Sequence, residues 1–236
     1  LLLRCAWAGS QKYGALVWSG DIKSSFPSMK NQVAAGLNMG IAGIPWWTTD
    51  IGGFFGANIN DPEFHELLVR WFEYGCFCPV MRLHGYRWPL QPQYGTTGGA
   101  TCVSGAPNEV WSYTDQVCEI LSDYLRLRER MLPYITELME EAHEKGTPVM
   151  RPLFYDFPED KESWNVETEY MFGPKVLVKP ITDADARETD VYLPGGASWT
   201  NAWTGETFEG GQKVHVAAPI EQIPLFTRDG YKLPMK

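Results

Sequence analysis

The chain has 236 residues, 44% hydrophobic and 21% charged, with a formal net charge of −9 at pH 7. This composition excludes wholesale disorder, and the negative charge argues against a nucleic-acid partner, which needs a basic surface. No apolar run approaches the roughly 20 residues that cross a bilayer, so the sequence predicts no membrane partner.

Residues 1–81 alternate between predicted strands and predicted helices. The sequence begins Leu1-Leu2-Leu3-Arg4 rather than with Met, which reads as the middle of a buried strand. We therefore expect that an N-terminal part, with any targeting signal, lies outside it. Further strands are predicted at 13–18, 41–47 and 78–81. Helices are predicted to begin at Phe26, capped by Ser25, and at Pro62, capped by Asp61. The alternation predicts βα units and a parallel sheet.

Residues 88–107 form a loop rich in Pro, Gly and Thr, which we interpret as an active-site insertion. A helical region follows at 108–145, and Pro133 predicts its division into two helices. Residues 149–157 are predicted to form one more strand of the parallel sheet. Counted as barrel units, residues 1–158 supply about four strands, half of the eight in a (β/α)8 barrel. Either the other half lies outside the sequence, or another chain completes the sheet.

The pattern changes after Pro158, where short strands alternate with Gly, Pro and Asp turns. This pattern is typical of an antiparallel β-sandwich. The predicted fold is therefore α/β followed by all-β. Residues 1–160 would form the C-terminal half of a (β/α)8 barrel, and residues 161–236 a small antiparallel β-sandwich domain.

The five cysteines show no metal-binding pattern, because Cys76 and Cys78 are too close for a zinc knuckle and no matching pair follows. They are interpreted as buried reduced thiols. No ligand set for a metal or cofactor is visible, and none is predicted.

Polar residues with a possible role in chemistry follow the predicted strands. Asp21 follows Trp18-Ser19-Gly20, Asp50 precedes a Gly-Gly turn, and Arg4 and His84 follow two other strands. A glycosidase needs one carboxylic acid to protonate the leaving oxygen and a second carboxylate at the anomeric carbon. Aromatic faces such as those of the chain's 10 Trp can stack on sugars. Taken singly, however, such an Asp is more often a turn former, and such a His more often structural.

The ordered motifs of this sequence resemble glycoside hydrolase family 31, the α-glucosidases and α-xylosidases. The matching segments, which cover nearly the whole chain, are Trp18-Ser19-Gly20-Asp21, Trp47-Thr48-Thr49-Asp50-Ile51-Gly52-Gly53-Phe54, Arg82-Leu83-His84-Gly85, Arg130-Met131-Leu132-Pro133-Tyr134, 147–152 and 170–180. The resemblance implies a retaining mechanism on a (β/α)8 barrel followed by β-sandwich domains, with an oligosaccharide or another α-glycoside as substrate and no cofactor.

The resemblance also implies roles for individual residues. Asp21 takes the place of the general acid/base, and the substrate-binding residues would be Arg4, Trp18, Trp47, Asp50, Phe54 and His84. The family's nucleophile is an aspartate upstream of the residue matching Arg4. No residue precedes Leu1 here, so we expect the isolated chain not to turn over substrate.

The sugar that would be cleaved remains open at this stage. The segment Arg82–Arg87 and the end of the Gly-rich insertion look most like bacterial α-xylosidases, which favours xylosyl over glucosyl substrates. An α-glucosidase or α-transglycosylase of the same fold is one alternative. A non-catalytic, carbohydrate-binding half-barrel is another. Compartment and oligomeric state are not predicted.

Overall fold

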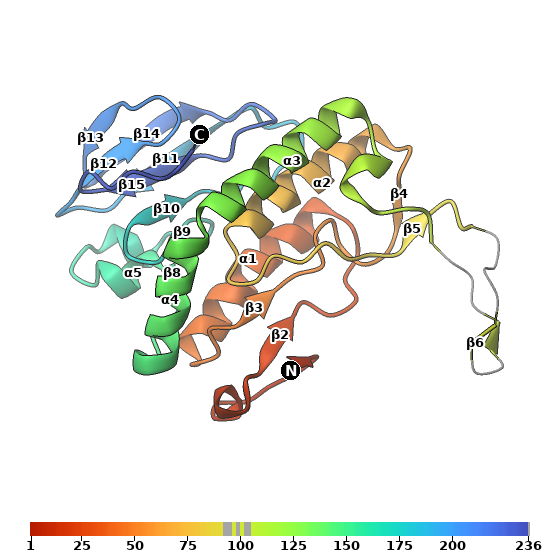
Figure 1. Cartoon of the computed structure of the whole chain (residues 1–236). Helices are drawn as coiled ribbons and strands as arrows, with labels where there is room; N and C mark the ends of the chain where they lie inside the picture. Colours follow the sequence, from red (N-terminus) through yellow and green to blue (C-terminus); the bar gives the residue numbers. More distant parts are fainter. Residues whose placement is uncertain (92–95, 98–99, 102–104, 236) are drawn as a thin grey trace.

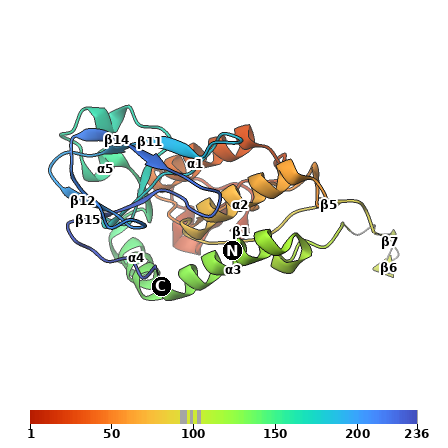
Figure 2. The same ribbon diagram turned by 90° about the horizontal axis from the view of Figure 1, so that it is seen from above.

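The computed structural model describes residues 1–91, 96–97, 100–101 and 105–235. The chain forms two lobes, seen in Figure 1: residues 1–145, mostly helical around a small parallel sheet, and residues 146–235, mostly antiparallel sheet. We call them the N-terminal and C-terminal lobes. Figure 2 shows the antiparallel pair β6 (Thr96–Thr97) and β7 (Ala100–Thr101) at the end of the molecule farthest from the C-terminal lobe.

The sheet of the N-terminal lobe contains β1 (Leu2–Leu3), β2 (Leu16–Trp18) and β3 (Trp47–Thr48), in that order and all parallel. The predicted parallel sheet is thus confirmed, but its strands are shorter than expected. The strand predicted at 41–47 is wrong, because α1 continues to Ile41 and β3 begins only at Trp47. Residues 78–81 are not assigned as a strand either, although the Val80 amide donates to the Trp47 carbonyl at 3.1 Å.

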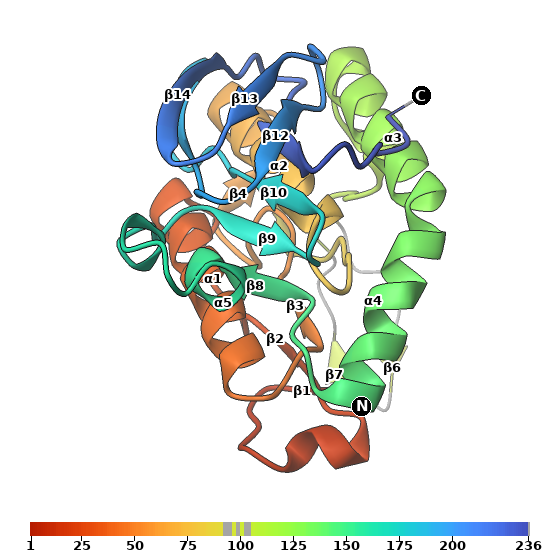
Figure 3. The same ribbon diagram turned by 90° about the vertical axis from the view of Figure 1, so that its left-hand side faces the viewer.

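Side-chain caps begin the first two helices where the sequence predicted. The Ser25 hydroxyl accepts from the Ser28 amide at 3.3 Å before α1 (Phe26–Ile41). Asp61 accepts from the Glu63 amide at 3.0 Å before α2 (Pro62–Cys76). The predicted division of the helical region is also confirmed, because α3 (Asp115–Arg130) and α4 (Leu132–Lys145) are separate and run end to end in Figure 3.

Short strands lie before, at the start of and within the predicted insertion. β4 (Ala57–Asn58) pairs in parallel with β5 (Arg87–Trp88), and β6 (Thr96–Thr97) pairs with β7 (Ala100–Thr101). Two 3₁₀ turns, η1 (Ser10–Tyr13) and η2 (Val110–Ser112), complete the lobe. The insertion at 88–107 falls partly outside the described residues, and its role remains a prediction.

The C-terminal lobe has a six-stranded antiparallel sheet in the order β13-β12-β15-β10-β9-β8. Its strands are β8 (Met150–Pro152), β9 (Tyr170–Phe172), β10 (Val176–Val178), β12 (Ser198–Asn201), β13 (Thr207–Glu209) and β15 (Leu225–Arg228). A separate antiparallel pair joins β11 (Glu188–Leu193) to β14 (Gln212–Ala217). The antiparallel strands predicted after residue 161 are confirmed.

One predicted strand belongs to a different sheet. Residues 149–157 were expected to extend the parallel sheet, but β8 pairs antiparallel with β9, and Leu153–Asp156 forms the short helix α5. The last short helix, η3 (Glu162–Trp164), follows α5. We therefore propose to place the boundary between the lobes before β8 rather than at residue 160.

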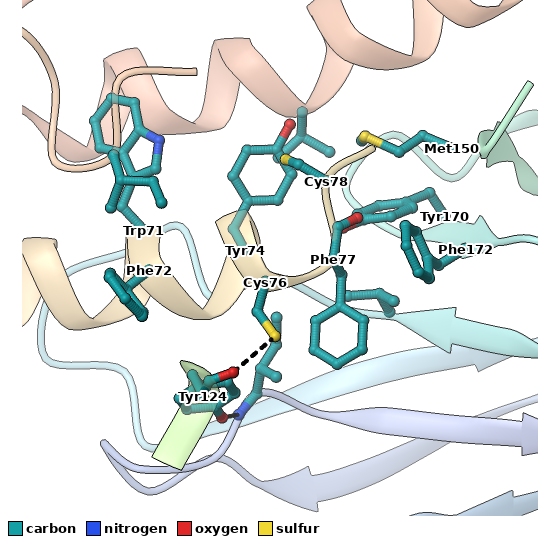
Figure 4. Close-up of a cluster of buried hydrophobic side chains, with 14 of the residues drawn as sticks. Trp71, Phe72, Tyr74, Cys76, Phe77, Cys78, Tyr124, Met150, Tyr170 and Phe172 are labelled. Atoms are coloured by element: carbon teal, nitrogen blue, oxygen red, sulfur yellow. Dashed lines mark hydrogen bonds between the residues drawn. The ribbon is translucent and has the colours of Figure 1, made fainter. Parts of the chain in front are cut away.

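The larger of two hydrophobic clusters joins the two lobes, and the second lies within the C-terminal lobe. Figure 4 shows side chains from the end of α2 packed against residues of β9. The Phe77 and Phe172 rings meet edge to face with centroids 5.9 Å apart, and the Tyr170 hydroxyl donates to the Phe77 carbonyl at 3.0 Å. Cys76 and Cys78 lie here as unpaired buried thiols, as predicted, whereas Cys5 is exposed and Cys118 is partly exposed. Burial raises the pKa of each of the two buried thiols to about 12.

Candidate active site

The candidate residues gather where the parallel strands end. Arg4 follows β1 directly, and Asp21 and Asp50 come soon after β2 and β3. Because the strands are parallel, their carboxyl ends meet at one edge, the edge that carries the active site in barrel enzymes. Here Arg4 Nη2 lies 2.7 Å from Asp21 Oδ2, and the two side chains are 63% and 45% exposed. Both remain accessible to a ligand.

Aromatic side chains line part of this edge. The Arg4 guanidinium lies 5.9 Å from the ring centroid of Trp18, the last residue of β2. Phe54 and the exposed His84 stack with centroids 5.6 Å apart and planes 28° apart. A flat apolar face beside polar groups suits a sugar ring, which has both C–H faces and hydroxyls.

Asp50 differs from Asp21 because it is fully buried. Its carboxylate forms an ion pair with Arg82, and its amide donates to Ser19 Oγ at 3.3 Å. Burial raises the pKa of Asp50, an effect that the positive charges of Arg82 and His84 oppose and the nearby Asp21 reinforces. The Ser19 hydrogen bond, the Arg82 ion pair and the stacking of Phe54 on His84 show that the loops after β2 and β3 and the segment 82–84 come together at one place.

Trp47 lies apart from the exposed members of this group. Its ring is buried against α1, so close that a Cβ built on Gly36 would come within 2.7 Å of Trp47 Nε1. The structure thus brings together Arg4, Trp18 and Asp21, couples them to Asp50 and His84, and places Trp47 in the core. A substrate contact for Trp47 remains a prediction.

Two arginines that the sequence reasoning missed hold the loop after β3. Arg82 neutralises Asp50, and the buried Arg87 donates to the carbonyls of Gly53 at 2.8 Å and Ile51 at 3.0 Å. The loop can turn sharply because Gly53 has φ +76°, where a Cβ would lie 2.6 Å from the Ser24 backbone. Both arginines flank His84 in the sequence, but nothing local distinguishes a buried guanidinium from an exposed one.

Neither a metal cluster nor a membrane span is found in the part of the chain that the structure describes. Among these residues, no three His, Cys, Asp or Glu side chains are grouped to hold a metal ion. None of the helices there combines the length and apolar character that crossing a bilayer requires.

Comparison with known proteins identifies the family. The model described as the glycosyl hydrolases family 31 TIM-barrel domain matches residues 1–138, and the family 31 C-terminal domain matches residues 146–233. The chain belongs to glycoside hydrolase family 31. A barrel-type domain followed by a C-terminal domain is therefore the architecture of this family 31 chain, and the resemblance seen in the sequence motifs is confirmed.

Relatives in the family carry several different activities in their names, α-xylosidase and α-glucosidase among them. A crystal structure of a family 31 α-xylosidase from a soil metagenome, complexed with xylose, is 55% identical with a TM-score of 0.95, over 98% of this chain and 35% of that one. The α-xylosidase of Saccharolobus solfataricus is 39% identical over 100% of this chain and 30% of its own length. Alpha-glucosidase 2 of Bacillus thermoamyloliquefaciens is 35% identical over 98% and 26%. The chain spans about a third of the length of these relatives.

Proposed function

We propose that this chain contributes the general acid/base, Asp21, to a retaining α-glycoside hydrolase. The substrate would be a non-reducing-end α-linked xylosyl or glucosyl residue of an oligosaccharide. The observation that carries the proposal is the accessible Asp21 carboxylate, paired with Arg4 at the carboxyl ends of the parallel strands, in a chain of this family. Glycoside hydrolysis needs such a carboxyl group to deliver a proton to the leaving oxygen.

Asp50 is a poor second carboxylate for the reaction. A nucleophile must reach the anomeric carbon, but Asp50 is fully buried and its charge is neutralised by Arg82. We propose that the nucleophile comes from outside residues 1–236, so that the isolated chain does not turn over substrate. In the complete site the two carboxyl groups would lie about 5–5.5 Å apart, the spacing of retaining enzymes.

The proposed reaction has two steps. In the first, the nucleophile attacks the anomeric carbon while protonated Asp21 gives its proton to the leaving oxygen. In the second, Asp21 takes a proton from water, which releases the sugar with retained configuration. Arg4 and His84 would hold sugar hydroxyls, Trp18 and Phe54 would contact the ring, and buried Asp50 would keep Arg82 in place.

A xylosyl substrate is favoured over a glucosyl one. The support is the 55% identity to the xylose-bound α-xylosidase, compared with 35% to the α-glucosidase. Xylose lacks the exocyclic CH2OH of glucose, and a difference of that size gives about 1–3 kcal/mol of discrimination. Glucosyl hydrolysis, transfer to an acceptor sugar, or binding without cleavage would each show as a different product pattern.

The finer details of the fold belong to the same proposal. The three parallel strands with α1 and α2 support a partial (β/α)8 barrel. The six-stranded sheet and the β11–β14 pair support a β-sandwich in the C-terminal lobe.

Asp21→Asn tests the proposal in the full-length protein that carries this chain. We expect kcat/KM on an aryl α-xyloside to fall about 10²–10⁴-fold, the usual contribution of general acid–base catalysis. The loss should be smaller for a substrate with a very acidic leaving group, which departs without a proton. Azide should restore turnover and give the α-glycosyl azide, because azide replaces water without needing a base.

The matched control is Asp123→Asn. Asp123 forms an exposed ion pair with Arg126 at the same 2.7 Å, but on the outer surface of α3. This variant should keep wild-type activity. Full activity in Asp21→Asn would refute the role of Asp21. Turnover by the isolated 236-residue chain that Asp21→Asn abolishes would refute the external nucleophile.

A further inference from the structure

An exposed tryptophan on the C-terminal lobe is held flat. Trp164 ends η3 and is 58% exposed. Its ring stacks on Phe154 of α5, with centroids 4.5 Å apart and planes only 9° apart. Its Nε1 donates to the Pro158 carbonyl at 3.0 Å. With one face covered and its only polar atom already bonded, the ring presents one bare apolar face to solvent.

The turn that carries Trp164 is anchored to the sheet behind it. Asp160 accepts hydrogen bonds from the Tyr192 hydroxyl at 2.7 Å, the Gly195 amide at 2.7 Å and the Glu162 amide at 3.1 Å. Burial alone would raise the pKa of Asp160, but these hydrogen bonds outweigh it and hold the pKa below its ordinary value. A charged carboxylate thus fixes η3, so little ordering entropy would be lost when a ligand binds the ring.

Polar residues neighbour Trp164 in the chain, on the same turn. Glu162 and the exposed Asn165 stand on either side of Trp164 in the chain, with Asn165 Nδ2 at 3.5 Å from Glu162 Oε2. Lys213 of β14 lies 3.4 Å from Glu162. The flanking groups therefore supply both hydrogen-bond donors and acceptors, which could meet the hydroxyls of a sugar.

We propose that Trp164 is a platform that binds a pyranose ring of an oligosaccharide or polysaccharide. A flat apolar face on a turn that also carries donors and acceptors matches a sugar ring, which has a C–H face bordered by hydroxyls. A protein partner fits less well, because hot-spot residues of protein interfaces lie within a larger surface that excludes water, whereas the residues near Trp164 in the chain include the polar Glu162 and the exposed Asn165. The platform lies on the C-terminal lobe, and Figures 1 and 2 show α5 at the opposite end of the molecule from β6.

The platform can be observed directly by ¹⁹F NMR of the full-length protein labelled with 5-fluorotryptophan. The Trp164 resonance is assigned as the one missing in Trp164→Phe. The probes are maltohexaose and a xyloglucan heptasaccharide, added to the Asp21→Asn variant so that no cleavage occurs. We expect the Trp164 resonance to shift in a saturable way. An unchanged Trp164 resonance at millimolar sugar would overturn the proposal.

Substitution of Trp164 provides a second test. In affinity electrophoresis through gels containing soluble starch or xyloglucan, Trp164→Ala should weaken retardation about tenfold, the scale of one aromatic contact. The retardation of Trp164→Phe, which keeps an aromatic ring, should lie between those of Trp164→Ala and wild type. Trp7→Ala is the control, since Trp7 is even more exposed, at 82%, but lies in the N-terminal lobe.

Two further outcomes would overturn the platform. Equal retardation of Trp164→Ala and wild type would place binding elsewhere. Self-association that Trp164→Ala abolishes, or a Trp164 that iodide cannot quench, would show that protein covers the ring. Because these readouts record sugar binding and not turnover, they do not depend on whether the proposed hydrolysis is correct.

Discussion

Two arginine–carboxylate pairs in this chain have the same chemistry and opposite surroundings. Arg70 and Glu73 on α2 are both fully buried between the lobes, 3.1 Å apart. Arg4 and Asp21 at the strand ends are closer, at 2.7 Å, but about half exposed. The difference lies in what else each pair bonds to.

The buried pair is a hub of hydrogen bonds between the lobes. The Arg70 guanidinium donates to carbonyls of the C-terminal lobe, among them Ala218 at 2.7 Å and Ala186 at 3.0 Å. The Tyr124 hydroxyl on α3 donates to Glu73 at 3.0 Å and accepts from the Ile223 amide at 3.0 Å. Arg70 and Glu73 use their hydrogen bonds within the protein and so stabilise the fold. Arg4 and Asp21 are exposed, and their remaining hydrogen-bonding groups can bind a ligand.

The largest expected effect on stability is that of Arg70→Met. The change removes the hydrogen-bond donor for several buried carbonyls and for the buried Glu73 carboxyl group, so the free energy of unfolding should fall by about 3–5 kcal/mol. Urea denaturation of the full-length protein, followed by circular dichroism, measures it. Arg126→Met removes an exposed guanidinium from α3 and should cost less than about 0.5 kcal/mol. Equal losses in the two variants would contradict the special role of the buried pair.

A smaller effect concerns pH and Glu73. Burial raises the pKa of Glu73 to about 8 in the folded chain, although Arg70 and Tyr124 act to lower it; the ordinary value is 4.5. Between these values the folded state holds a proton that the unfolded state has lost. The free energy of unfolding should therefore fall as pH rises from about 4.5 to 8, by up to about 1.4 kcal/mol per pH unit.

Glu73→Gln cannot titrate, so its thermal midpoint should lose this part of the pH dependence. Midpoints at pH 5, 6.5 and 8 measure the slope, and Glu119→Gln, an exposed substitution on α3, is the control with an unchanged slope. The same slope in Glu73→Gln and wild type would show that another group causes it.

The sequence predicted the helix boundaries that depend on contacts between residues close together in the chain. Ser25 and Asp61 begin helices in the sequence and in the structure, because each cap bonds to an amide only two or three residues away. Pro133 likewise marked the division between α3 and α4. For the site, the ordered motifs identified the family and pointed to Asp21, and the structure pairs it with Arg4.

The pairing of β8 and the burial of several side chains depend on contacts between residues far apart in the chain, and the sequence did not predict them. The sequence of β8 is compatible with another barrel strand, but in the structure β8 pairs with β9. The residues of a strand do not by themselves determine which strand it pairs with. The sequence also does not reveal which arginines contact buried groups. Arg70, Arg82 and Arg87 resemble ordinary surface arginines, yet each donates to a buried acceptor on a distant segment. Asp50, expected to bind substrate, is buried and paired with Arg82, and its contact with sugar remains a prediction.

Breaking the exposed Arg4–Asp21 pair should have only a small effect on stability. Arg4→Met should change the free energy of unfolding by less than about 1 kcal/mol, because solvent screens the pair and its side chains need not be fixed. Its effect on catalysis should be large by comparison, since the guanidinium would no longer orient Asp21 or bind a sugar hydroxyl. Steady-state kinetics of Arg4→Met and of the matched Arg126→Met in the full-length protein separate the two effects. Arg126 has the same pair distance and similar exposure, so a loss of kcat/KM in both variants would reveal a general charge effect, and a loss in Arg4→Met alone would assign it to the strand ends.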